Sequence, residues 1–153
     1  MEKSADLSGC GRYRYALRRR WSGGDQVLFV MLNPSTADAE KDDPTIRRCI
    51  AFAQEWDFGA LAVGNLFAFR TPSPRGLRAA ADPVGPHNDR ELVRLQAESK
   101  LVVAAWGNYG GFLQRDAAVR ALLSGLHILG LTKQDQPRHP LYVPAETQPR
   151  AWD

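Results

Sequence analysis

The chain has 153 residues, a formal net charge of +3 at pH 7 and 44% hydrophobic residues, so it is long and apolar enough for one domain with a core. Its two cysteines, Cys10 and Cys49, exclude a disulfide framework, a four-cysteine zinc site and a cysteine-bound iron–sulfur cluster. No apolar run approaches the ~20 residues of a membrane span, and MEKSADLSGC lacks the apolar core of a secretory signal. We expect one cytoplasmic, monomeric domain over residues 1–153, with no metal and no cofactor.

The first predicted element is a strand in the arginine-rich segment RYRYALRRRW, residues 12–21. The segment alternates with a period of two, which is typical of a half-buried strand. The alternation places two sets of side chains on opposite faces: Tyr13, Tyr15 and Leu17 on one, Arg14 and Arg18 on the other. The arginines permit a phosphate-bearing partner, or they form an ordinary solvated strand face.

Strand and helix patterns then alternate along the chain. Residues 26–32 (QVLFVML) are a continuous apolar run, which predicts a strand covered on both faces. A helix follows over residues 43–59, since Asp43 can cap it, Pro44 suits its first turn and Gly59 lies just past its end. The remaining predicted elements are strand 60–67, a Pro- and Gly-rich excursion 68–87, helix 88–99, strand 100–107, helix 112–125, strand 126–131 and a proline-broken tail 132–144.

This order predicts an α/β fold, a three-layer sandwich with a mostly parallel four-stranded central sheet and an N-terminal antiparallel edge strand. Ligands of such sheets bind beyond the carboxyl ends of the strands. Polar side chains follow each strand there: Asn33, Ser35, Thr36 and Asp38, then Asn65 and Arg70, then Trp106, Asn108 and Tyr109, then Thr132, Lys133, Arg138 and His139. We expect them to line one cleft, although each group also fits an ordinary turn or cap.

Several motifs of catalysis and nucleotide binding do not occur in the sequence. There is no G-x-x-x-x-G-K-[ST] loop and no G-x-G-x-x-G after a strand, so no phosphate-cradling loop of either type is expected. His87, His127 and His139 lack metal-ligand spacing, and there is no G-x-S-x-G nucleophile elbow.

Three segments resemble motifs of the uracil-DNA glycosylase superfamily: MLNPS (31–35), LAVGNLFAFRTPSP (61–74) and RHPLY (138–142). Their order and spacing extend from Gln26 to Val143. The pattern as a whole is similar to an uncharacterised bacterial and phage family known as domain of unknown function 1643, of which the chain is identified as a member. The resemblance implies a uracil-DNA glycosylase-like fold and a nucleic-acid partner, with DNA as the expected substrate.

The resemblance also implies roles for single residues. Asn33 matches the position that orients the attacking water, Asn65 the amide that reads the base edge, and His139 the histidine that stabilises charge on the departing base or its sugar. Leu141 departs from the pattern because it replaces a serine that clamps phosphate. Members with an iron–sulfur cluster use four cysteines, which this chain cannot supply.

Cleavage of an N-glycosidic bond builds negative charge on the leaving base and needs a positioned water. Asn33 can orient that water but cannot act as a base, so Asp38 is the nearest carboxylate for that role, while Asp42 and Asp43 fit helix caps better. A flipped base needs an aromatic side chain to stack on, and the phosphates of the nucleic-acid strand need cationic side chains. The expected substrate-binding residues are Pro34, Ser35, Thr36, Asn65, Phe67, Arg70, Trp106, Tyr109, Lys133 and Arg138, of which Phe67 fits core packing equally well.

Three functions stay open on the sequence. The first is hydrolysis of an N-glycosidic bond at a uracil-like or modified base. The second is a non-catalytic nucleic-acid or nucleotide binder, which the neutral Asn33 and the apolar Leu141 favour. The third is an enzyme that acts on free nucleotides or nucleosides, which the small size and weak basicity favour.

Overall fold

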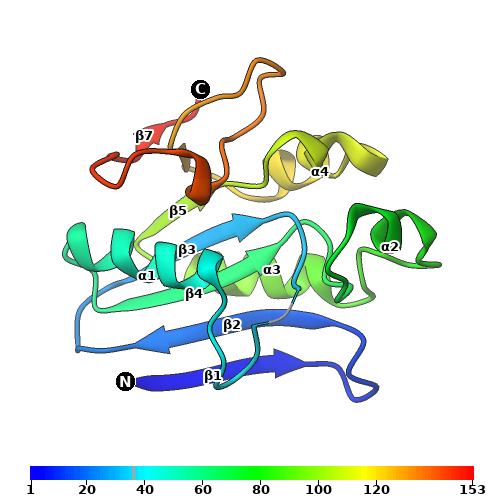
Figure 1. Ribbon diagram of the computed structural model, residues 1–153, viewed down its shortest axis with the longest axis horizontal. Coiled ribbons are helices and arrows are strands. Elements are labelled where there is room, and N and C mark those ends of the chain that lie inside the picture. Colours follow the sequence, from blue (N-terminus) through cyan, green and yellow to red (C-terminus); the bar gives the residue numbers. More distant parts are fainter. Residues whose placement is uncertain (36) are drawn as a thin grey trace.

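A mixed β-sheet runs through the protein, as the ribbon of the computed structural model shows (Figure 1). Among the described residues this sheet has seven strands. The structure describes residues 1–35 and 37–153. The strands lie in the order β1-β2-β4-β3-β5-β6-β7. Their bounds are Glu2–Leu7 for β1, Arg14–Arg20 for β2, Gln26–Met31 for β3, Ala60–Asn65 for β4, Leu101–Ala104 for β5, Leu126–Ile128 for β6 and Arg150–Ala151 for β7.

The sheet is larger and less parallel than the sequence predicted. Strands β3, β4, β5 and β6 are parallel to one another, whereas β1, β2 and β7 pair antiparallel with their neighbours. The arginine-rich strand β2 is therefore not an edge, because β1 covers it. Neither β1 nor β7 was predicted, since β1 is mostly exposed and polar and β7 has only two residues. An exposed edge strand needs no apolar period and so leaves little signal in a sequence.

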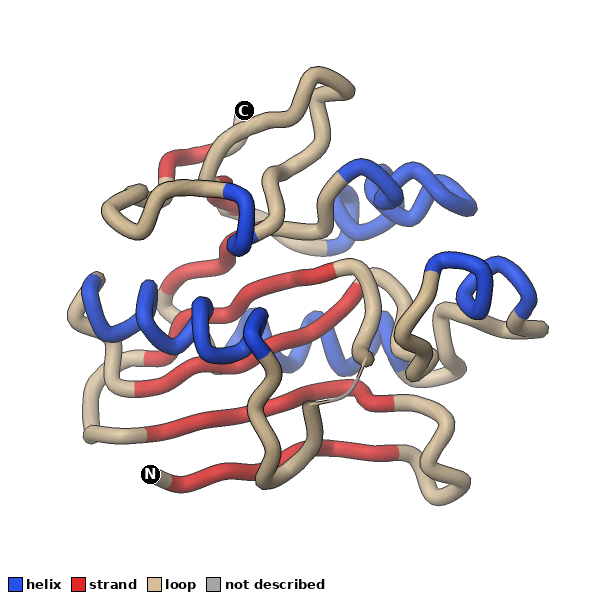
Figure 2. The backbone as a smooth tube through the Cα atoms, in the orientation of Figure 1, coloured by secondary structure: helices blue, strands red, loops and turns tan. Residues whose placement is uncertain are grey.

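Helices cover both faces of the sheet (Figure 2). They are α1 Pro44–Glu55, α2 Pro74–Ala79, α3 Asn88–Ala97 and α4 Arg115–Leu122, with 3₁₀ helices η1 at Asn108–Gln114 and η2 at Pro140–Tyr142. Helix α1 packs on one face through Phe52, which lies in the same apolar cluster as Phe29 of β3. Helices α3 and α4 pack on the other face. Among the described residues, no helix has the length and apolarity needed to cross a membrane.

The predicted start of α1 is confirmed. The Asp43 carboxylate accepts a hydrogen bond from the backbone N–H of Ile46 at 2.9 Å, and Pro44 occupies the first turn. Two other predictions need correction. The helix predicted over 112–125 begins only at Arg115, because Leu113 and Gln114 both have φ of 54°, which ends any continuous helix. The irregular excursion contains the short helix α2, which the side chain of Ser73 caps.

The strand order creates a reversal of direction beside β3. The chain leaves β3 through α1 to β4 on one side, then returns through α3 to β5 on the other side of β3. In open parallel sheets such a reversal opens a crevice at the carboxyl ends of the two strands, and ligands bind there. The loops that follow β3 at Leu32 and β5 at Ala105 flank this crevice.

Candidate functional site

A cavity of about 820 Å³ opens at the carboxyl edge of the parallel strands. Segments that follow β3, β4, β5 and β6 all contribute to its lining, so the polar groups that the sequence placed after each strand meet in one place. The predicted site residues that line it are Asn33, Pro34, Ser35, Asn65, Trp106, Tyr109, Lys133, Arg138 and His139. Asn33, Asn65 and His139 come from three separate segments and share this one cavity.

Three of the described residues that were predicted for the site are not part of this lining. The Asp38 carboxylate instead accepts backbone hydrogen bonds from Lys41 at 2.7 Å and Glu40 at 2.9 Å, and these bonds lower its pKa. Phe67 is fully buried in the core and packs against Phe112. Arg70 lines a second, smaller cavity and donates to the backbone oxygen of Gly11 at 3.2 Å. Thr36 lies outside the described residues.

Asn65 is the last residue of β4, and its side chain is an unpaired polar group in the cavity wall. The residue is only 1% exposed, yet within residues 1–35 and 37–153 neither Nδ2 nor Oδ1 has a hydrogen-bond partner. Its backbone oxygen, by contrast, accepts a hydrogen bond from Asn88 at 2.9 Å. A buried amide without partners is costly, and such exceptions point to an unmet ligand, water or ion. The free donor and acceptor of Asn65 therefore mark the part of the cavity that a polar ligand would complete.

Asn33 presents one defined side of its amide to the cavity. Its Nδ2 donates to the backbone oxygens of Thr71 at 2.9 Å and Pro34 at 3.1 Å. Both partners are acceptors, so the nitrogen is assigned to that side and Oδ1 is left as the free acceptor. The loop after β3 thus offers an oxygen that can accept a hydrogen bond from water or from a ligand.

His139 presents a hydrogen-bond donor to the same cavity. Its Nδ1 accepts the backbone N–H of Leu141 at 3.1 Å, which places the proton of the neutral ring on Nε2. Burial lowers the pKa of His139 below its usual value, and the nearby Asp43 opposes this only in part. The ring is therefore neutral at pH 7 with a donating Nε2–H, and it packs on the ring of Tyr142.

Asp43 lines the cavity, although the sequence favoured a helix cap for it and Asp38 as the catalytic carboxylate. Its Oδ1 caps α1, while Oδ2 lies 3.4 Å from Ser35 Oγ. One carboxylate therefore serves both the helix and the cavity. The sequence signal was present, because a capping residue that begins the first helix after β3 must stand beside the carboxyl end of that strand.

Arg14 also lines the cavity, and the sequence gave no indication of it. Strand β2 pairs Ala16 with Asp6 but Arg14 with Leu7, so Tyr15 is an extra residue and β2 has a bulge there. The bulge reverses the side to which Arg14 points. The predicted alternation, which put Arg14 and Arg18 on one face, is therefore wrong. Arg18 binds Asp6 and a carboxylate at the end of α3, whereas Arg14 reaches Ala37 on the α1 side.

The mouth of the cavity carries aromatic and cationic side chains. Tyr142 is 75% exposed, and Tyr109 is also exposed. Lys133 and Arg138 are exposed at the same rim. Trp106 lies deeper, and its indole N–H donates to Gln136 Oε1 at 2.8 Å. Asn108 and Thr132, which were predicted to line the cleft, also line the cavity, and further lining residues that were not predicted are Thr45, Thr71, Gln134 and Tyr142.

The fold and the cavity define an α/β protein with a cavity lined in part by polar side chains at the reversal point of a mixed sheet. The chain belongs to the family described as "Protein of unknown function (DUF1643)", whose model matches residues 14–141. Comparison with curated proteins finds no match, and comparison with solved structures finds none. Among the described residues, no group of three or more His, Cys, Asp or Glu side chains is arranged to hold a metal ion.

Proposed function

We propose that the cavity recognises a nucleobase and that the protein hydrolyses an N-glycosidic bond at a flipped base, as members of the uracil-DNA glycosylase superfamily do. The single observation that carries the proposal is the Asn65 amide, buried in the cavity wall without a partner. An amide offers one donor and one acceptor side by side, which suits the edge of a nucleobase. Trp106, Tyr109 and Tyr142 supply aromatic surface in the same cavity.

The other lining residues suit the proposed reaction. A water that donates hydrogen bonds to Asn33 Oδ1 and Asp43 Oδ2 attacks the anomeric carbon of the sugar as the carbon–nitrogen bond breaks. The bonding electron pair leaves with the base, and the proton of the water passes to Asp43, which takes the role first assigned to Asp38. The neutral His139 donates a hydrogen bond from its Nε2–H to the base as negative charge develops there, and it keeps that proton. The base leaves as an anion that takes up a proton from solvent, and Asp43 returns the proton of the water to solvent. The products are the free base and a sugar hydroxyl.

A second candidate is a nucleotide or nucleic-acid binder without catalysis on the same cavity. One observation favours it: Asp43 is already engaged by the N–H of Ile46 and by Ser35, so the only carboxylate among the described lining residues is partly occupied. Asn33 cannot replace it, because an amide is not a useful base. Binding that depends on Asn65 is common to both candidates, and base release separates them.

The first test is Asn65→Leu, with Gln54→Leu as the control, because Gln54 is exposed on α1 and does not line the cavity. Oligonucleotides that carry uracil or modified bases, and the matching free nucleosides, are assayed for binding and for base release. Loss of a bidentate contact worth about 1–3 kcal/mol predicts a loss of roughly ten- to a hundredfold in base binding. Asn65→Leu removes a buried unpaired amide, so we also expect the free energy of unfolding to rise or stay unchanged.

The outcomes of this test discriminate between the candidates. Base release by the wild type that Asn65→Leu abolishes supports the glycosylase. Base binding that depends on Asn65, without release from any substrate of the panel, supports the binder. Equal binding of every base by the wild type and by Asn65→Leu would contradict nucleobase recognition at this cavity.

A further inference from the structure

Among the described residues three arginines are buried, and they differ in how their charge is matched. The guanidinium of Arg19 donates to Asp42 at 2.8 Å and to four backbone oxygens. That of Arg115 donates to Asp89 at 2.7 Å and to the backbone oxygen of Leu66. Both cations therefore have an anionic partner, as buried charges usually do.

Arg14 is the exception. The residue is 3% exposed, and among the described residues its side chain makes one hydrogen bond, from Nη1 to the Ala37 oxygen at 2.8 Å, while its buried Nε has no partner there. In the described part of the chain no carboxylate forms an ion pair with it. Burial lowers its pKa to about 10, so the side chain still carries its charge at neutral pH.

The bulge at Tyr15 determines the face of the sheet to which the Arg14 side chain points. In a regular strand the side chain of Arg14 would lie on the face opposite Leu17, which is the face that α3 covers. The extra residue in the bulge places the Arg14 side chain on the other face, where it lines the cavity. Bulges of this kind are found next to active sites, where they re-aim a side chain. Strand β2 lies beside β4, where Leu17 pairs with Val63, so Arg14 and Asn65 stand at the same end of adjacent strands.

We propose that Arg14 binds a phosphate group of the ligand while Asn65 binds its base, so that the cavity takes nucleotides in preference to free bases or nucleosides. The inference rests on the proposed function for the identity of the base. Two unpaired polar groups in one cavity wall, a neutral amide and a cation, match a ligand with a neutral hydrogen-bonding edge and an anion. Lys133 and Arg138 add positive charge at the rim of the same cavity.

The test compares matched pairs of nucleosides and their 5′-monophosphates by calorimetric titration of the full chain. We expect the wild type to bind a monophosphate at least about tenfold more tightly than its nucleoside. Arg14→Gln should reduce that preference to within about twofold and leave nucleoside affinity unchanged. Arg20 of β2 pairs with Ala60 at the amino end of β4, remote from the cavity, so Arg20→Gln should keep the full preference for the monophosphate. Retention of the preference in Arg14→Gln overturns the proposal.

A second measurement separates this inference from the proposed function. Inorganic phosphate should protect the wild type against thermal unfolding and should not protect Arg14→Gln. Phosphate protection without nucleoside binding supports the anion site and contradicts base recognition. Nucleoside binding that depends on Asn65, without a preference for the monophosphate, contradicts the phosphate site at Arg14 and leaves base recognition supported.

Two additions keep the test decisive. Should Arg14→Gln fail to fold by circular dichroism, Arg14→Lys replaces it, because lysine keeps the charge but loses the planar fork. It should retain part of the preference, and a preference equal to that of the wild type would contradict binding through the guanidinium.

A short single-stranded oligonucleotide in place of the monophosphate identifies the source of the phosphate. Affinity that depends on Arg14 with either ligand supports the site.

Discussion

His139 is the best-defined hydrogen-bond donor that the cavity offers to a leaving base. The backbone N–H of Leu141 occupies Nδ1, and burial lowers the pKa of the ring, so the proton stands on Nε2 at neutral pH. A neutral donor is suited to charge that develops only as the bond breaks. The proposed chemistry therefore depends on a backbone contact within η2 as much as on the imidazole itself.

The lowered pKa of His139 has a consequence for stability that can be measured. When pH falls through about 6.5, the unfolded chain takes up a proton at this position before the folded protein does. The free energy of unfolding should therefore decrease as pH falls below about 6.5 and be fully retained above it. Urea unfolding between pH 5 and 8 measures this, and His139→Gln should remove part of the decrease.

The control for this prediction is His127→Gln on strand β6, outside the cavity lining. A pH profile that His139→Gln leaves unchanged would contradict the assignment of a buried neutral ring. Activity gives a second readout, because protonation of Nδ1 would break the contact with Leu141 and should lower base release at acidic pH.

The position of a side chain can be predicted from the sequence where the strand that carries it is regular. Asn33 and Asn65 were predicted to share a cleft because each follows an apolar run, and regular strands keep their carboxyl ends at one edge. Arg14 was missed, since a bulge inserts one residue without any change in composition, and the alternation of residues 12–20 gives no sign of it. Asp38 was placed in the site by its proximity in sequence, but two backbone N–H groups engage its carboxylate elsewhere.

At the scale of elements, α1 and the cavity share the carboxylate of Asp43. Its Oδ1 satisfies the N–H of Ile46 at the start of the helix, and its Oδ2 faces Ser35 in the cavity. Substitution by alanine removes both functions, whereas serine at an N-cap keeps the hydrogen bond to the helix. The two roles can therefore be separated with a pair of variants.

Asp43→Ala should lower the free energy of unfolding by about 1 kcal/mol, and Asp43→Ser should change it by only a few tenths. Both variants should lose base release, because neither retains the carboxylate that accepts the proton of water. Chemical denaturation measures the first quantity and single-turnover base release the second. Full activity in Asp43→Ser would remove Asp43 from the proposed reaction and leave it as a cap.

Elements with a strong local signal were predicted well. The apolar run of β3 and the cap of α1 were placed within a residue or two of their observed bounds. The start of α4 was missed because Leu113 and Gln114 adopt left-handed backbone conformations that neither residue type favours. Such conformations are imposed by the surrounding tertiary structure and have no signature in the local sequence.

At the scale of the whole molecule, the position of the cavity follows from the connection order. The alternation of strands and helices predicted a mostly parallel sheet with a site at its carboxyl edge, and the cavity lies there. The alternation could not predict that β4 and β5 lie on opposite sides of β3, because the sequence of elements is the same for either arrangement. The reversal beside β3 is therefore a property of the assembled sheet.

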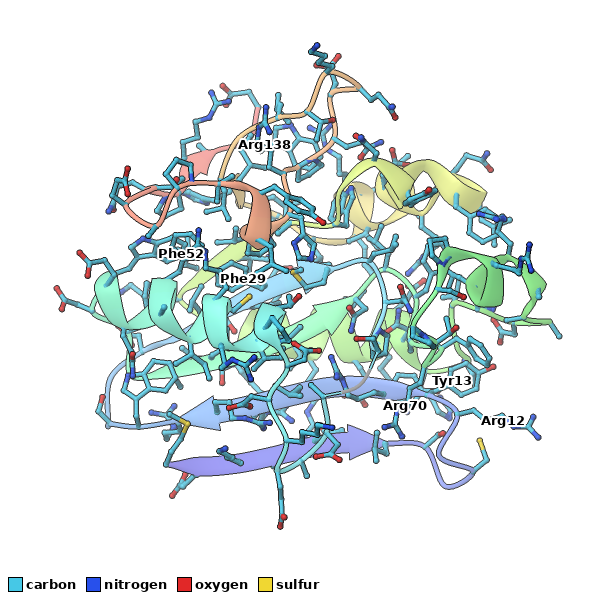
Figure 3. All side chains as sticks on the ribbon, in the orientation of Figure 1. Arg12, Tyr13, Phe29, Phe52, Arg70 and Arg138 are labelled. Atoms are coloured by element: carbon cyan, nitrogen blue, oxygen red, sulfur yellow. The ribbon has the colours of Figure 1, made fainter. Side chains whose placement is uncertain are left out.

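Cations lie on two sides of this cavity. Arg138 and Lys133 line its rim, and Arg12 and Arg70 line the neighbouring cavity that shares Ser35 with it. Figure 3 shows Arg12 and Arg70 beside the amino-terminal start of β2, and Arg138 in the upper part of the molecule. A nucleic-acid strand with its base in the cavity would extend its phosphates in both directions, so both pairs of cations would meet phosphate.

This arrangement predicts a modest salt dependence for oligonucleotide binding, in keeping with a net charge of only +3. Substitution of Lys133 and Arg138 by Gln should reduce the slope of log affinity against log salt by about 2, and so should substitution of Arg12 and Arg70. Arg20→Gln should leave the slope unchanged, because Arg20 lies at the opposite end of the sheet. A slope that neither pair alters would show that the strand does not cross this edge, and a free nucleotide would then be the better ligand.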